Sequence, residues 1–218
     1  MDAVEHIVTL YSVSWYSWAM LLLAGCAVLS EVFQPGVMTA TTAVVFSRSE
    51  RMYKQTPDNF PGQLTATLFR LGTIALMLVL VVKDRFGTAL EGLMLYGIAV
   101  GLLMAVAVTK MLCNQIVDYT FGLKYRAMGV TLHYANIVTM LCLGLYPVLL
   151  VLPLIGNITM SRWVAVGFAG LFIGLITYRL AQIYMTGAKA IVYILIYVLT
   201  LEVLPWSLPV VVMLKMMN

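Results

Sequence analysis

Long continuous apolar stretches are the feature that most constrains how this chain can fold. Six of them approach or exceed about 20 residues, the length that an α-helix needs to cross the hydrocarbon core of a bilayer. A membrane-spanning β-barrel would instead alternate apolar and polar residues over about ten positions. Because only helices and closed barrels satisfy their backbone polar groups in lipid, we expect an all-α polytopic membrane helical bundle.

The composition agrees with this fold class. Hydrophobic residues make up 62% of the 218 residues and charged residues only 10%, whereas a soluble domain has about 25% charged residues. The chain is therefore predicted to be one integral membrane domain, residues 1–218, without a large soluble part. The six predicted spans cover about residues 15–33, 63–82, 93–113, 136–155, 163–184 and 190–214.

Two connections between the predicted spans are long. Residues 34–62 are first apolar and then charged, and residues 115–135 mix aromatic and basic side chains. The second pattern suits a helix that lies in the membrane interface, with a plain surface loop as the alternative. We therefore expect one or two interfacial helices besides the spans.

Basic residues in the connections predict the orientation, because cytoplasmic loops carry an excess of lysine and arginine. Eight lie on one side of the predicted spans and four on the other. The eight are Arg48, Arg51, Lys54, Lys110, Lys124, Arg126, Arg179 and Lys189. This bias predicts a cytoplasmic location for these connections and a periplasmic one for both termini. The net charge of +4 reflects these loops and does not indicate nucleic-acid binding.

Two spans carry small residues at helical spacing, a pattern that lets helix backbones approach closely. We predict that these are helix-packing residues. They are Gly97, Gly101 and Ala105 in span three and Gly170 and Gly174 in span five. Two interpretations stay open, namely packing within the chain and an interface with a second copy or a partner protein.

Each of these helices also carries a basic residue near its end. Lys110 lies nine residues after Gly101, and Arg179 lies nine residues after Gly170. Nine residues are half a revolution of an α-helix. We therefore expect one face of each helix to pack closely and the opposite face to present the charge.

Span six contains a carboxylate, Glu202, about 12 residues from its start. A charge near the bilayer midplane costs about 2.5–3.5 kcal/mol and usually faces the bundle interior. Pro205 has no N–H, so the carbonyl of Leu201 loses its helical donor beside Glu202. Pro209 repeats this effect one turn later, and we expect span six to bend here.

Several other polar side chains fall in the cytoplasmic half of the predicted spans. Together with Glu202 they form a candidate intramembrane cluster of Arg179, Arg70, Lys110, Asn136 and His133. In a structural role, Glu202 pairs with Arg179 as first choice or Arg70 as second, and the remaining basic residues reach the headgroups. In a functional role, the cluster lines a polar cavity for an anionic headgroup, an anion or a proton. Both roles stay open.

Recognisable catalytic patterns are missing from the sequence. It contains no Gly-rich phosphate loop, no His-Glu-x-x-His and no Gly-x-Ser-x-Gly. The two histidines are His6 and His133, the three cysteines lack metal-ligand spacing, and no predicted span holds two carboxylates. We expect no catalytic residues, no metal and no cofactor.

Several motifs together carry a resemblance to a known family. They are "FSRSERMYKQ", "LTATLFRLG", a third span ending in Lys110, the proline-containing "LGLYPVLLVLPL" and the terminal "YILIYVLTLEVLP". With these motifs the chain resembles, over about residues 15–214, an uncharacterised family of Bacteroidota integral membrane proteins, the domain of unknown function family 4271. The resemblance implies an inner-membrane location and brings no activity.

The residues favour a non-enzymatic envelope component that binds membrane lipids, a protein partner or a second copy of itself. A small transporter or lipid-translocating permease that uses the polar cluster is the alternative, and a membrane enzyme comes third. The absence of catalytic pairs and of a visible inverted repeat orders these hypotheses.

Overall fold

The fold is known from a computed structural model, which describes residues 14–35, 59–82, 89–121, 124–155 and 158–184. These residues form five helices and confirm the predicted all-α membrane bundle. The helices are α2 (Ser14–Phe33), α4 (Phe60–Val82), α5 (Ala89–Phe121), α6 (Lys124–Ile155) and α7 (Ile158–Tyr184). Each contains at least 18 consecutive residues that are apolar enough to cross a membrane. The sixth predicted span, 190–214, lies outside the described residues.

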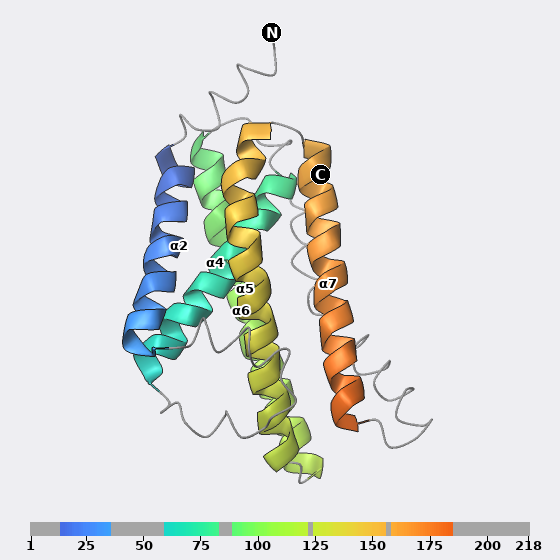
Figure 1. The fold of residues 1–218 in the computed structure, drawn as a ribbon. Coiled ribbons are helices and arrows are strands. Elements are labelled where there is room, and N and C mark those ends of the chain that lie inside the picture. Colours follow the sequence, from blue (N-terminus) through green and yellow to red (C-terminus); the bar gives the residue numbers. More distant parts are fainter. Residues whose placement is uncertain (1–13, 36–58, 83–88, 122–123, 156–157, 185–218) are drawn as a thin grey trace.

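Successive helices run in opposite directions (Figure 1). The C-terminal ends of α2, α5 and α7 and the N-terminal ends of α4 and α6 lie at one end of the bundle. This end borders the three connections in which the sequence concentrates its basic residues. The alternation of the first five spans therefore agrees with the sequence, while their orientation relative to the membrane stays a prediction.

Residues 115–135 differ from the sequence-based expectation. Instead of a separate interfacial helix, they continue α5 to Phe121 and begin α6 at Lys124, with only residues 122–123 between them. The sequence places Gly122 directly after the last residue of α5, where glycine is the preferred helix-ending residue. The two helices are 33 and 32 residues long and form a hairpin that extends past the other helices (Figure 1).

Helix α4 is the centre of the bundle, and α2, α5, α6 and α7 all pack against it. Apart from Arg70, its residues from Leu68 to Val82 are apolar or small on every side, as is typical of a helix in the centre of a bundle. In the apolar part of α4 that is long enough to span a membrane, 56% of the residues are buried, compared with 11% in the corresponding part of α7. Its side chains Phe69, Leu76 and Val79 are almost fully enclosed.

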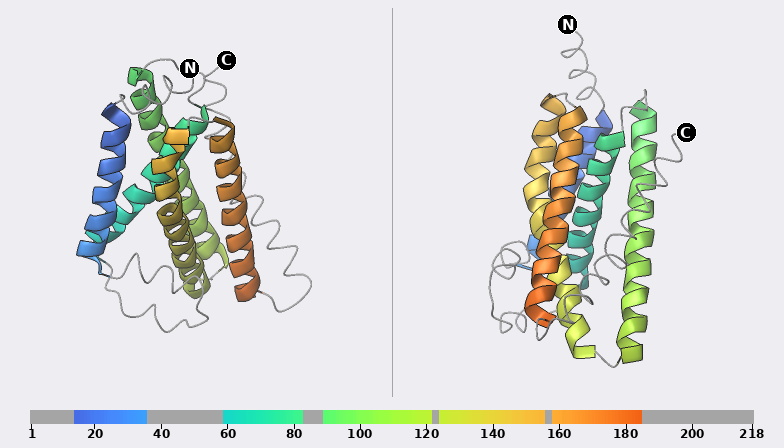
Figure 2. Two further views of the ribbon diagram at one scale, coloured as in Figure 1. Left: turned by 45° about the horizontal axis from the view of Figure 1, so that its top comes forward. Right: turned by 90° about the vertical axis from the view of Figure 1, so that its right-hand side faces the viewer.

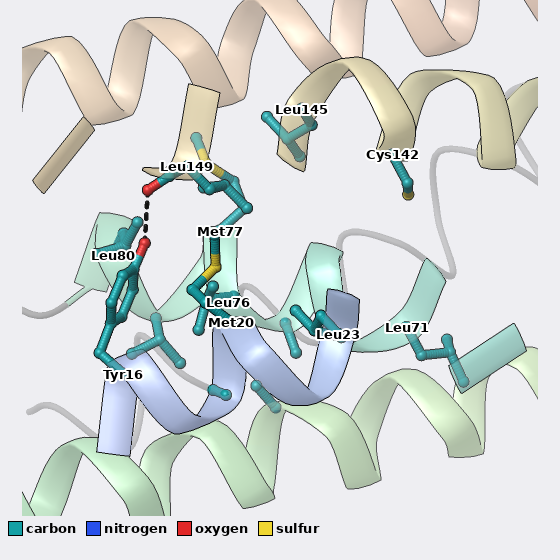
Figure 3. Packing of buried hydrophobic residues seen from close by; sticks show 14 of the residues in the cluster. Tyr16, Met20, Leu23, Leu71, Leu76, Met77, Leu80, Cys142, Leu145 and Leu149 are labelled. Atoms are coloured by element: carbon teal, nitrogen blue, oxygen red, sulfur yellow. Dashed lines mark hydrogen bonds between the residues drawn. The ribbon is translucent and has the colours of Figure 1, made fainter. Parts of the chain in front are cut away.

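Two tyrosines join α2 to α6 in opposite directions. The Tyr16 hydroxyl of α2 donates to the carbonyl of Leu149, at 2.7 Å, and Figure 3 shows this bond beside the buried leucines and methionines. The Tyr146 hydroxyl of α6 donates to the carbonyl of Met20, at 3.0 Å. Pro153 has no N–H, so the Leu149 carbonyl lacks its usual helical donor. Tyr16 therefore satisfies a backbone group that the proline leaves open in an apolar environment.

Candidate functional site

The candidate site is centred on Arg70, the one basic residue of α4. Arg70 is ten residues from Phe60 and twelve from Val82, so it lies about 15 Å along the helix. This is close to the middle of the helix, and the position of Arg70 in the cytoplasmic half of the span stays a prediction. Helix α4 begins at Phe60, three residues before the predicted start of the span, so Arg70 lies further from the helix start than the sequence indicated.

The Arg70 guanidinium is half-buried and donates to three oxygens. Its Nε donates to the carbonyl of Ala66, at 3.0 Å, and Nη2 donates to the hydroxyl of Thr67, at 2.9 Å. Its Nη1 donates to the carbonyl of Ala135 on α6, at 3.2 Å. These bonds fix the plane of the guanidinium and aim it across the contact between α4 and α6.

Polar groups of α6 surround this contact. The Thr139 hydroxyl donates to the same Ala135 carbonyl, at 2.8 Å. The Cys142 thiol donates to the backbone carbonyl of Arg70, at 3.8 Å. Arg70 is thus tied to α6 through its side chain and its backbone. Asn136, a residue of the predicted cluster, is half-buried and follows Ala135 directly.

One face of α4 is less covered than the rest. From residue 69 to residue 81, every position is buried except Arg70, Ile74, Leu78 and Val81, which are half-buried. Their spacing of three or four residues puts them on one face, and half-buried Thr67 extends it by one turn. We call these five residues the Arg70 face.

The other helices surround α4 in the order α5, α2, α6, α7. Trp15 of α2 stacks on Tyr96 of α5, with ring centroids 6.2 Å apart, while the two tyrosine bonds join α2 to α6. Helix α6 packs against α7, and α5 and α7 do not pack extensively against each other. Figure 2 shows α4 between α7 and α5 in its right-hand view.

The remaining members of the predicted cluster fall into three groups. Lys110 is half-buried on α5. His133 lies on α6 and Arg179 on α7, and for both the structure describes the helical backbone. Glu202, with Pro205 and Pro209, lies outside the described residues. The structure thus brings Arg70 next to Ala135, the residue before Asn136. In the part of the chain that it describes, no group of three or more potential metal ligands occurs.

The predicted small-residue faces point outward in the described part of the bundle. Gly97, Gly101, Gly170 and Gly174 are exposed, and a Cβ added at any of them would meet no atom within 4 Å. Ala105 is also exposed. The buried residues of α5 are instead Leu95, Ala99 and Leu103, and Lys110 shares their side of the helix. The expected arrangement of packed and charged faces on α5 is therefore reversed.

The glycines that do allow close packing were not singled out from the sequence. A Cβ on Gly72 would clash with Leu23 of α2 and lie 2.9 Å from the Tyr96 hydroxyl of α5. A Cβ on Gly92 would lie 2.8 Å from the Trp15 ring. Each is a single glycine without a repeat, so spacing gives no signal. The available signal was the position of Gly72 in the middle of a long and mostly apolar helix.

The fold and the Arg70 site define a multi-pass helical membrane protein with an arginine held inside the bundle. The family model "Domain of unknown function (DUF4271)" matches residues 16–216, so the chain belongs to this family. No curated protein and no solved structure matches it. The family assignment agrees with the resemblance that the sequence motifs indicate.

Proposed function

We propose that the protein is a non-enzymatic component of a membrane complex in the bacterial inner membrane and binds a protein partner or lipid through α5 and α7. The observation that carries this proposal is the outward position of their small residues in the described bundle, where no described atom lies within 4 Å of a Cβ added to the glycines. Bacteroidota origin and periplasmic termini are parts of the same proposal. They rest on the sequence motifs and on the distribution of basic residues.

Physical chemistry supports a partner helix on such a face. Helices in lipid gain no hydrophobic free energy by associating, so they depend on close packing, which small residues permit. Glycine also weakens a helix by about 1 kcal/mol relative to alanine. A row of outward glycines therefore reduces helix stability without improving packing among the described helices, and a partner helix on this face would make close contacts that offset this loss.

The test is a Gly101→Leu variant, purified in mild detergent with wild type as reference. We expect wild type to form a stoichiometric complex, with a partner protein or a second copy, and Gly101→Leu to lose it. The matched control is Gly144→Leu on α6, another exposed glycine with open space above it but without small residues one turn away. A wild-type protein that remains a monomer without bound lipid, or a Gly101→Leu complex that persists, would contradict the proposal.

A transporter or lipid-translocating permease is the second candidate, and Arg70 is the observation that favours it. A charge in the middle of a span is costly and often marks a pathway for an ion or a headgroup. The test is movement of a fluorescent anionic lipid between leaflets of proteoliposomes. Wild type should accelerate it, and Arg70→Gln should abolish the acceleration. Equal rates with wild type, Arg70→Gln and empty liposomes would exclude lipid translocation.

A further inference from the structure

We propose that Trp18, Trp163 and Tyr178 lie in the two headgroup regions of the membrane, and that they fit the protein to a phospholipid bilayer whose hydrocarbon core is thinner than the usual value of about 30 Å. The partner is thus a lipid surface of defined thickness. The proposal concerns depth along the helices. It goes beyond the partner-binding function, which concerns the outward sides of α5 and α7.

The exposed aromatic side chains of the described residues gather near the helix ends. Five are exposed, and each lies within six residues of the end of its helix. They are Trp18, Phe33, Phe60, Trp163 and Tyr178. The large exposed side chains between them on α2 and α7 are all aliphatic. Because tryptophan and tyrosine are enriched at membrane–water interfaces, this pattern indicates an aliphatic band between two aromatic layers.

Trp18 and Trp163 mark the same level on two separate helices. Helices α2 and α7 begin at the same end of the bundle and lie on opposite sides of it (Figure 1). Trp18 is four residues from the start of α2, and Trp163 is five residues from the start of α7, which puts them about 6 and 7 Å along their helices. Their side chains are 63% and 68% exposed. The two indoles therefore form one layer on both sides of the bundle.

Phe33 and Tyr178 mark the second layer. Each lies 15 residues after the tryptophan of its own helix, which corresponds to about 22 Å along the helix axis. Tyr178 is 58% exposed and brings a phenol hydroxyl to this level. The equal spacing on two helices gives the aliphatic band one height on both sides of the bundle.

Basic residues border the same band on α7. Arg162 directly precedes Trp163 and is exposed, and Arg179 directly follows Tyr178 in the sequence. The two arginines are 17 residues, or about 25 Å, apart along the helix. Arginine near the end of a membrane helix extends its charge toward the headgroups. Since a bilayer thins around an apolar stretch that is shorter than its core, the anchors of α7 favour a thin core.

Helix α4 supports a thin core in a second way. Its apolar stretch of 22 residues is the longest among the described helices and would cover about 33 Å if it stood upright. Figure 1 shows that α4 is inclined relative to α2 and α7. A long apolar stretch fits a thinner bilayer by tilting. The inclination of α4 therefore agrees with the short band on α2 and α7.

Quenching of tryptophan fluorescence tests the depth of Trp163. The full-length protein keeps Trp163 as its single tryptophan, with Trp15, Trp18 and Trp206 replaced by phenylalanine. It is reconstituted in phosphatidylcholine vesicles whose acyl chains carry bromine either near the headgroup or near the chain end. We expect the ratio of shallow to deep quenching to be above unity.

The matched control moves the tryptophan to the middle of α7. It combines Trp163→Phe with Leu171→Trp in the same background, at a position that is 61% exposed. Its ratio of shallow to deep quenching should be below unity. A ratio below unity for Trp163 itself, or equal ratios for the two proteins, would overturn the proposed depth.

Acyl chain length tests the thickness with the wild-type protein. Its melting temperature is measured in vesicles of dimyristoleoyl, dioleoyl and dierucoyl phosphatidylcholine, whose chains lengthen in this order. We expect the highest melting temperature with the shortest chains and the lowest with the longest, because mismatch grows with core thickness. A maximum in either of the longer lipids, or no dependence on chain length, would overturn the thin core.

A displaced anchor tests whether the aromatic layer sets this preference. Trp163→Leu combined with Met160→Trp moves the indole three residues toward the start of α7 and lengthens the band by about 4.5 Å. Met160 is 45% exposed, so the new side chain has room. The highest melting temperature should move to dioleoyl phosphatidylcholine. Leu171→Met leaves both anchors in place and should keep the wild-type order of lipids. The same order in the displaced variant would refute the role of Trp163.

Discussion

The two sides of the bundle use glycine in different ways. On the α2 side of α4, Gly72 and Gly92 each fill a contact in which a methyl group would meet a neighbouring helix. On α5 and α7, Gly101 and Gly170 face outward with no described atom within reach of an added Cβ. The same residue is thus required by packing on one side and is free of described contacts on the other.

This difference separates what stabilises the bundle from what lies on its surface. The side with Gly72 is also where Tyr16 and Tyr146 join α2 to α6 and where the largest buried side chains meet. The α5 and α7 side carries exposed Met111, Trp163 and Leu171. We therefore expect substitutions on the first side to change folding stability and those on the second to change association.

The largest effect should come from Gly72→Leu. Its side chain would have to displace Leu23 and Tyr96 at the meeting point of three helices. Overpacking typically costs about 1–3 kcal/mol, and the displacement of side chains on two helices puts Gly72→Leu at the upper end of this range. Thermal unfolding in detergent measures this loss of stability. A Gly72→Leu variant as stable as wild type would contradict the conclusion that the α2 side of the bundle depends on close packing at glycine.

Arg70→Lys should give the next largest effect, because Arg70 lies where the two sides meet. A lysine ammonium cannot reach Ala66, Thr67 and Ala135 from one position as the planar guanidinium does. Three interhelical or intrahelical bonds at about 0.6 kcal/mol each give a loss of about 2 kcal/mol. Equal unfolding temperatures of Arg70→Lys and wild type would show that these bonds contribute little.

Tyr16→Phe should have a smaller effect, about 1 kcal/mol, because it removes one hydrogen bond to a buried carbonyl. The explanation through Pro153 can be tested directly. In a Pro153→Ala background, the alanine N–H can bond to the Leu149 carbonyl, so Tyr16→Phe should cost less there. Exposed Tyr178→Phe is the control. An equal cost in both backgrounds would contradict the role assigned to Pro153.

Gly101→Leu should have the smallest effect on unfolding. The position has open space, and leucine is the better helix former, so stability should be unchanged or up to about 1 kcal/mol higher. Thermal unfolding of the dissociated protein measures it. A fall comparable to that of Gly72→Leu would mean that the α5 glycine face packs within the chain.

Much of the fold was accessible from the sequence because the bilayer restricts the solutions. The helical class and the five described spans follow from apolar length alone. The ends of the helices were harder to predict, because α5 extends past its apolar stretch to Phe121 and α6 begins before its apolar stretch, at Lys124. Polar residues there are compatible with a helix in water as well as with a loop, so hydropathy could not separate the two.

For the site, the sequence identified Arg70 as unusual by its charge within an apolar span. It could not identify the partners, because Ala135 and Ala66 contribute backbone carbonyls that any residue would provide. It also left open whether the repeated glycines pack within the chain or at an interface, and it did not single out Gly72. Spacing shows that residues share a helix face, but the neighbouring helices determine whether that face is covered.

The sequence by itself determined that this chain crosses a membrane as helices, because only helices and closed barrels satisfy backbone polar groups in lipid and the continuous apolar stretches lack the alternation of a barrel. It also determined that Arg70 and Glu202 stand inside apolar segments. Only the tertiary structure decided that α4 is central, that Arg70 bonds to α6, and that the α5 glycines point outward in the described part of the bundle. Apolar residues are equally stable against lipid and against protein. Which side of each helix faces the bundle therefore depends on which side chains interdigitate.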